Sequence, residues 1–179
     1  MSQFPALTAT PATPTGFANL GYSLLSGAAA SITVSGIGAT YKEFIVLAWL
    51  KPSNDTVGLR IRPNNDSGAT YDHQGFYGNG ASVTNTAGTA ESGVIPNAGT
   101  NVDNGIGSFF RVNIYKNAAA LEGMIHSLGA MQQTTPSIYT NQNATRWNDT
   151  TNLMSSIVFL AEAGDLAANT MVSLFGLTP

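Results

Sequence analysis

The sequence predicts an all-β protein, an antiparallel β-sandwich that is jelly-roll-like. Residues 44–50 form an uninterrupted apolar run, and residues 57–62 alternate apolar and polar side chains with a period of two. Further short segments of this kind recur along the chain, with Gly, Asn, Asp and Pro between them. Strands do not alternate with helices, so a parallel sheet is disfavoured.

Length and composition indicate one domain with many turns. The chain has 179 residues, 19 of them Gly, with only seven Lys and Arg and ten Asp and Glu. The cations are scattered rather than clustered, so we expect no nucleic-acid binding. Cysteine is absent, which excludes disulfides and thiolate metal sites. We expect no cofactor, and no membrane association because no apolar run approaches the length of a span.

Residues 1–16 are predicted to form an extended arm ahead of a sandwich domain at residues 17–179. Three prolines in FPALTATPATP disfavour a helix or a central strand. The arm is either a frayed terminus or a segment that lies along a partner, with Phe4, Pro5 and Leu7 as apolar anchors. Its start lacks the features of a signal peptide, so we expect the chain to be made in a cytoplasm and used or assembled there.

The first predicted strands are residues 22–25 and 31–35, with a small-residue turn at 27–30 between them. Residues 44–50, FIVLAWL, carry apolar side chains on both faces of a strand. We therefore expect this strand to be buried on both sides or to lie at the centre of a sheet.

The middle of the chain contains two strands and two long loops. Val57, Leu59 and Ile61 share one face of a predicted strand. Residues 64–68, NNDSG, follow this strand, and their residue types favour a turn. Residues 71–74 are predicted to be a strand that leads into a glycine-rich loop. The polar residues 78–92 are predicted to be a surface loop or a loosely paired edge, and residues 97–108 are predicted to be a loop.

In the last third, residues 109–115 are a strand with Phe110, Val112 and Ile114 facing inward. A helix could start at 118, but a strand over 121–128 fits Gly123 and the hairpin-like spacing better. Residues 129–146 are predicted to be a second long loop. Strands then follow at 157–160 and 171–177, with a turn between them.

Candidate catalytic and metal-binding residues are few. His73 follows Asp72, and His126 lies four residues after Glu122, but no G-x-S-x-G motif accompanies them and packing is the favoured role. Residues 64–68 faintly resemble a calcium loop but lack the later Glu, so a β-turn is favoured. The triplets that begin at Asn54, Asn143 and Asn148 match the N-glycosylation pattern. Such matches are expected by chance in a chain rich in Asn and Thr.

Exposed aromatic rings can stack on the apolar face of a sugar. Five aromatic residues are candidates for this role, and ordinary packing in the core is the alternative role for each: Tyr71, Phe76, Tyr77, Tyr139 and Trp147.

Five segments carry a recognisable pattern of turns and strand ends: SITVSGIGATY (31–41), VGLRIRPNNDSGATYDH (57–73), VIPNA (94–98), RWNDTTNLMSSIVFL (146–160) and MVSLFGL (171–177). The order of these segments resembles that of a group of tailed-phage virion structural proteins. Pro63 and Phe175 depart mildly from the family pattern at the ends of two strands. The resemblance spans residues 31–177, and its motifs are turns and strand ends.

The resemblance implies a β-sandwich component of a virion with no catalytic residues to transfer. The expected role is a capsid decoration (cement) protein, a homotrimer that binds the major capsid protein and stabilises the icosahedral shell. A short chain without fibre-like repeats favours this role. The alternative is a tail fibre or baseplate component that binds host-surface glycans through aromatics in residues 78–92 and 129–146. A glycan hydrolase is disfavoured, because the acids lie mostly at turns and form no evident pair.

Overall fold

The computed structural model describes residues 16–54, 57–78, 82–94, 107–116, 120–132 and 138–177, which contain eleven strands and no helix. The strands are β1 (Phe17–Leu24), β2 (Ser31–Ser35), β3 (Glu43–Leu50), β4 (Leu59–Pro63), β5 (Tyr71–Gly78), β6 (Val83–Glu91), β7 (Ser108–Tyr115), β8 (Gly123–Gln132), β9 (Ile138–Trp147), β10 (Ser156–Ala161) and β11 (Met171–Leu177). The all-β prediction is confirmed. The predicted arm lies outside the described residues apart from Gly16.

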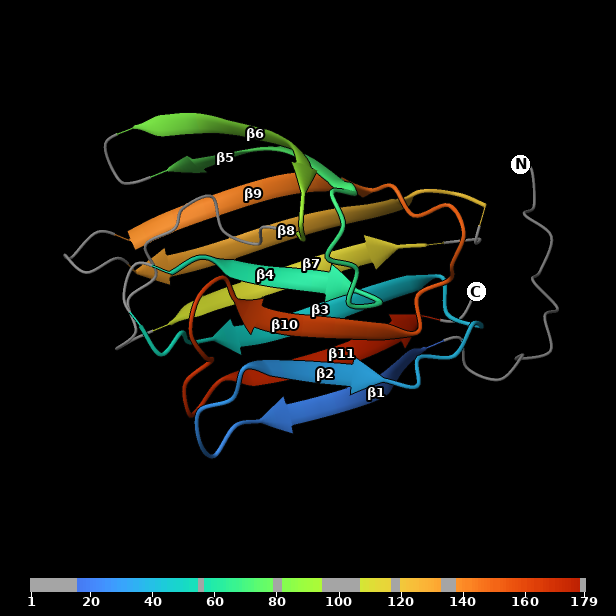
Figure 1. Ribbon diagram of the computed structural model, residues 1–179, viewed down its shortest axis with the longest axis horizontal. Coiled ribbons are helices and arrows are strands. Elements are labelled where there is room, and N and C mark those ends of the chain that lie inside the picture. The colour runs from blue at the N-terminus through green and yellow to red at the C-terminus, as the bar shows by residue number, and fades with distance from the viewer. Residues whose placement is uncertain are drawn as a thin grey trace, which may run out of the picture.

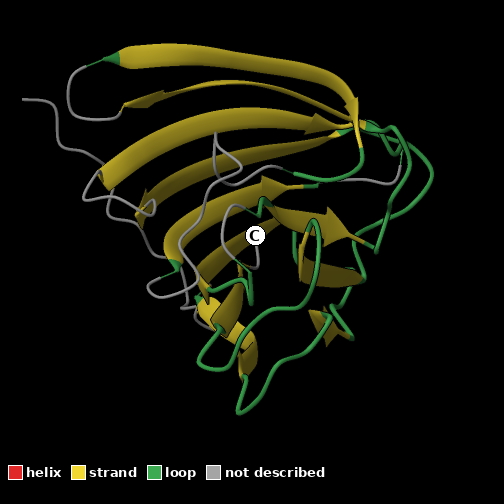
Figure 2. Ribbon diagram, turned by 60° about the vertical axis from the view of Figure 1, so that its left-hand side comes forward, coloured by secondary structure: helices red, strands yellow, loops and turns green. Residues whose placement is uncertain are grey.

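Two antiparallel sheets of unequal size pack face to face (Figure 1). The large sheet has eight strands in the order β1-β11-β3-β7-β8-β9-β5-β6, and the small sheet has three in the order β2-β10-β4. This arrangement is a β-sandwich, as predicted, while the jelly-roll connectivity stays a prediction. Figure 2 shows that the large sheet is curved and that β5 and β6 reach beyond the small sheet.

The core lies between the two sheets, and alternation along strands such as β3, β7 and β11 sends every second side chain into it. In the large sheet, Val46 pairs with Leu174 of β11 and with Val112 of β7, and all three are buried. In the small sheet, Phe159 of β10 pairs with Ile32 and Ile61 in the same way. Burial of each large apolar side chain contributes about 1.5–3 kcal/mol.

The turn after β4 has the geometry that its sequence predicts. Asn64 and Asn65 adopt positive φ angles of 52° and 53°, which Asn tolerates better than most residues. The Asn64 side chain accepts a hydrogen bond from the amide of Ser155 at 2.7 Å and donates one to the carbonyl of Leu153 at 2.9 Å. The turn therefore anchors the segment that precedes β10.

Two polar segments form strands where a loop was predicted, and for the first of them a paired edge was the stated alternative. Within residues 78–92, β6 pairs with β5 at the edge of the large sheet, and within residues 129–146 most positions belong to β8 or β9. For residues 78–92 the alternative of a loosely paired edge is confirmed, whereas the loop predicted at 129–146 is wrong. Polar side chains dominate β6 and β9. Their backbone hydrogen bonds with neighbouring strands hold them, and side-chain polarity does not report that pairing. The predicted loop at 97–108 lies mostly outside the described residues.

Two strand predictions need smaller corrections. The strand expected at 22–25 begins at Phe17, and the strand expected at 71–74 continues through Gly75 to Gly78. A Cβ at Gly75 would overlap Oδ1 of Asn143, so the glycine makes room for that side chain instead of ending the strand. The strand preferred over 121–128 is confirmed as β8.

The apolar strand β3 lies inside the large sheet, between β11 and β7, which confirms its predicted central position. The alternative expectation, burial on both faces, does not hold. Phe44, Val46 and Leu50 face the core, but Leu47 and Trp49 on the other face remain 37% and 36% exposed.

Candidate functional site

The outer face of the large sheet, which is turned away from the small sheet, is the most unusual surface of the described structure. Paired residues in antiparallel strands point to the same side, so the strand register identifies its members. One row runs across four strands through Leu24, Met171, Trp49 and Phe109, all of them exposed by more than a third.

The outer-facing side chains of β1, β11, β3 and β7 form a surface that we call the apolar half. Its large apolar members are Phe17, Tyr22, Leu24, Ile45, Leu47, Trp49, Phe109, Tyr115, Met171, Phe175 and Leu177. Contiguous exposed apolar surface of this kind is uncommon on soluble monomers and marks interaction sites.

Charged groups are sparse on the apolar half. Among the outer-facing positions of its four strands, Glu43 and Arg111 are charged, and Arg111 Nε donates a hydrogen bond to Oδ1 of Asn113 at 3.2 Å. The ion pairs among the described residues lie elsewhere: Arg146 pairs with Asp72 and Glu122, and Arg60 pairs with Glu91 and Glu162. Low charge combined with aromatic side chains is the composition of an interface core.

The outer face becomes more polar over β9, β5 and β6, beyond the exposed Met124 and Leu128 of β8. A hollow of about 380 Å³ lies here, lined by Gln74, Gly75, Phe76, Asn85, His126, Gln142 and Ala144. We call it the polar hollow. Nε2 of Gln142 lies 2.8 Å from Nε2 of His126, so the amide donates to the ring nitrogen. Phe76 is 45% exposed.

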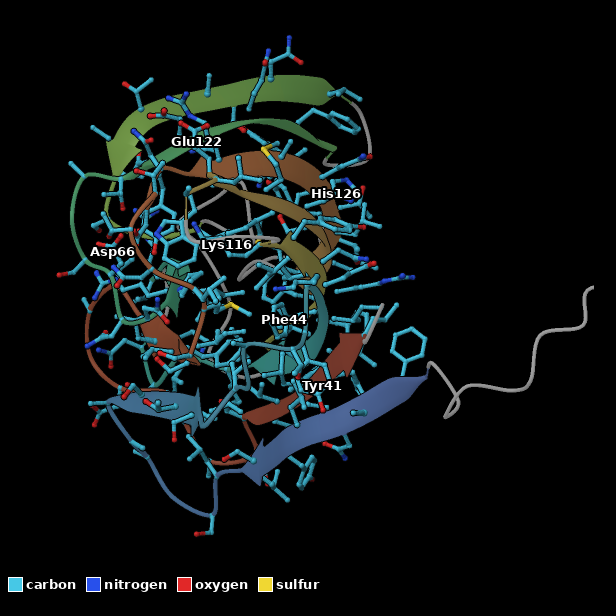
Figure 3. The ribbon with its side chains drawn as sticks, turned by 90° about the vertical axis from the view of Figure 1, so that its right-hand side faces the viewer. Tyr41, Phe44, Asp66, Lys116, Glu122 and His126 are labelled. Atoms are coloured by element: carbon cyan, nitrogen blue, oxygen red, sulfur yellow. The ribbon has the colours of Figure 1, made fainter. Side chains whose placement is uncertain are left out.

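The two histidines lie on opposite faces of the large sheet. His73 pairs with Thr145, which is buried, whereas His126 pairs with Ala144 on the outer face. Burial lowers the pKa of His73 below its usual value, and the nearby carboxylate of Glu91 offsets only part of this shift. Figure 3 shows His126 and Asp66 on opposite sides of the molecule.

The acids considered as catalytic partners are engaged elsewhere. Asp72 shares the outer face with Arg146 and pairs with it, so it points away from His73. The hydrogen bond from Arg146 is the main reason that the pKa of Asp72 lies below its usual value. Glu122, four residues before His126, also pairs with Arg146.

The loop considered as a calcium site is a turn whose acidic side chain is occupied by protein donors. Asp66 accepts hydrogen bonds from Trp147 Nε1 at 2.9 Å, Thr70 Oγ1 at 2.7 Å and the amide of Gly68 at 2.9 Å. Within the described ranges, no three His, Asp or Glu side chains are grouped as metal ligands. Asn143, one of the glycosylation candidates, is buried and therefore inaccessible.

The five aromatic candidates divide into three groups. Tyr71 and Trp147 are fully buried in the core, so they cannot stack on a sugar, and burial raises the pKa of Tyr71. Tyr77 and Tyr139 are half-buried and pack against each other with ring centroids 6.0 Å apart. Phe76 alone of the five is exposed and lines a hollow. The predicted anchors Phe4, Pro5 and Leu7 lie outside the described residues.

Lys116 is a buried cation that the sequence did not reveal. It is only 1% exposed, donates hydrogen bonds to the carbonyls of Leu121 and Asp149, and lies 5.0 Å from the centroid of the Trp147 ring. Burial lowers its pKa, against the opposing effect of Asp149 and Glu122. The residue ties the end of β7 to the segment after β9, which is a structural role.

No family model, curated protein or solved structure matches this chain. The described residues contain no helix with the length and apolarity to cross a membrane.

Proposed function

We propose that this chain is a non-enzymatic structural protein of a tailed-phage virion, a capsid decoration (cement) protein that binds and stabilises the icosahedral shell. The observation that carries the proposal is the apolar half. A sheet with a complete core on one face and exposed aromatic and aliphatic side chains on the other fits a subunit that works while docked on its neighbours. The resemblance of residues 31–177 to virion proteins supports the proposal that the neighbours are other virion proteins.

The partners under this proposal are the major capsid protein and further copies of the chain, assembled as a homotrimer on the capsid surface after synthesis in the host cytoplasm. The apolar half supports docking by burial of apolar area, with few charges to desolvate. It does not need the predicted arm, but the arm would add buried area if Phe4, Pro5 and Leu7 anchor it.

Binding to bare capsids tests the proposal. A Leu47→Lys/Phe109→Lys variant places two charges in the apolar half at positions that already reach solvent, so the fold should tolerate them. We expect cosedimentation with bare capsids to weaken by at least about tenfold. Thr33→Lys is the matched control, because Thr33 is exposed on the small sheet, and its binding should equal that of the wild type.

Undiminished capsid binding by the double variant would contradict docking through the apolar half. An image of the assembled particle tests the location independently. Density on the shell supports the decoration role, whereas density on the tail supports the alternative of a fibre or baseplate component. Absence of the chain from purified particles would overturn both.

A further inference from the structure

We infer that the polar hollow is a binding site for a neutral carbohydrate, with one sugar ring stacked on Phe76. This inference does not depend on whether the protein sits on the shell or the tail. It also uses a different part of the outer face from the apolar half, because the hollow lies over β8, β9, β5 and β6.

Strand register builds the hollow. Phe76 pairs with Asn85 on β6 and with Gln142 on β9, so an amide side chain flanks the exposed ring on each side. In the adjacent row, Gln74 pairs with the small residues Ala87 and Ala144. Small side chains in one row beside a large ring in the next leave an open space at the ring edge. Its volume of about 380 Å³ falls within the usual range of small-molecule sites.

The chemistry of the lining favours a polyhydroxylated, uncharged ligand. Asn85, Gln74 and Gln142 each offer both a donor and an acceptor, which matches the alternating needs of sugar hydroxyls. Phe76 offers an apolar surface for the C–H face of the ring. Apart from His126, none of the residues that line the hollow has an ionisable side chain.

An anionic ligand fits the hollow poorly. The nearest row of the outer face contains Arg146, but its guanidinium is engaged by Asp72 and Glu122. A phosphate or a carboxylate would therefore meet no free cation among the described residues that line the site.

The Gln142 side chain is already oriented before a ligand binds. Because the Gln142 amide nitrogen donates to Nε2 of His126, the amide group is oriented and its oxygen remains available to accept from a sugar hydroxyl. A polar group that is already oriented loses less conformational entropy when the ligand binds.

The test is a titration of the full-length, ¹⁵N-labelled protein with the methyl glycosides of glucose, galactose, mannose and N-acetylglucosamine, followed by NMR. We expect at least one glycoside to cause saturable shifts in the backbone amides of Gly75 and Ala144 and in the side-chain amides of Asn85 and Gln142. Phe76→Ala should weaken that binding by about tenfold. Phe109→Ala, which removes a similarly exposed ring from the apolar half, should bind as the wild type does.

Asn85→Ala provides a second variant that leaves the ring in place, and it should also weaken binding. The inference is overturned if none of the four glycosides shifts the hollow, if the shifts map elsewhere, or if Phe76→Ala binds unchanged. If N-acetylneuraminic acid or inorganic phosphate binds at the same residues more strongly than the four glycosides do, the inference that the ligand is neutral is overturned. Capsid cosedimentation of Phe76→Ala should remain normal, which separates failure here from failure of the proposed function.

Discussion

Asp66 joins the turn after β4 to the end of β9 through its hydrogen bond with the Trp147 indole. Burial by itself raises the pKa of Asp66, but the hydrogen bonds that its carboxylate accepts outweigh burial and hold the pKa below its usual value. The folded chain therefore holds the ionised form more strongly than the unfolded chain does.

The pH dependence of stability follows from this shift. As the pH falls below about 4, the unfolded chain takes up the proton first, so the free energy of unfolding decreases until the folded pKa is passed. Urea unfolding across this range should show the decrease, and Asp66→Asn should make it shallower. Equal slopes for the two proteins would contradict a role for Asp66.

Lys116 is the second residue whose environment has a measurable consequence. Lys116→Met keeps most of the aliphatic stem but leaves the carbonyls of Leu121 and Asp149 without this donor. We expect the free energy of unfolding to fall by about 2 kcal/mol. Lys42→Met is the control, since Lys42 contacts the exposed carbonyl of Ala39, and it should change stability by less than about 0.5 kcal/mol.

At the scale of elements, β5 depends on a close approach to β9. A Cβ at Gly75 would overlap the backbone oxygen of Gln142, so any larger residue pushes the two strands apart. Gly75→Ala should destabilise the protein by about 1–3 kcal/mol in chemical denaturation. Gly27→Ala is the matched control because no atom lies within 4 Å of the place that its Cβ would take, and its stability should stay near that of the wild type.

The edge position of β6 explains why its sequence is hard to interpret. Val83–Glu91 pairs with β5 on one side, and most of its side chains are exposed. A strand in this position needs no apolar face, because its backbone hydrogen bonds with β5 hold it in place. The sequence of β9 is hard to interpret for a related reason, because its buried side chains include the polar residues Asn141, Asn143 and Thr145.

At the scale of the whole molecule, the apolar half predicts self-association. Sedimentation velocity of the isolated wild type should show a trimer, and Leu47→Lys should shift the distribution toward monomer while the far-ultraviolet spectrum stays that of a β-protein. Thr33→Lys should remain trimeric. A wild type that is monomeric but binds capsids would mean that the capsid protein, rather than another copy, covers this surface.

Deletion of residues 1–14 tests the predicted arm separately from the sheet face. If Phe4, Pro5 and Leu7 anchor the protein, the truncated chain should bind bare capsids more weakly, by an amount that adds to the effect of the double variant. Undiminished binding by the truncated chain would exclude the arm as an anchor.

The candidate site was only partly predictable. Phe76 stands out in the sequence as an aromatic residue in a polar region, but Asn85 and Gln142 are brought to it by pairing with β6 and β9. Trp147 was an equal candidate for stacking on a sugar, but its side chain is buried in the core. A residue type indicates which contacts a side chain can make, whereas its neighbours across a sheet depend on register between distant segments.

The sequence by itself determined the fold class, because alternation with a period of two and the residues that accept positive φ are local properties of the chain. It also determined which side chains of β4 and β7 enter the core. Only the tertiary structure decided which of the two apolar faces of β3 is covered. Apolar side chains make a surface unfavourable in water, but they do not specify whether a second sheet or another molecule will cover it.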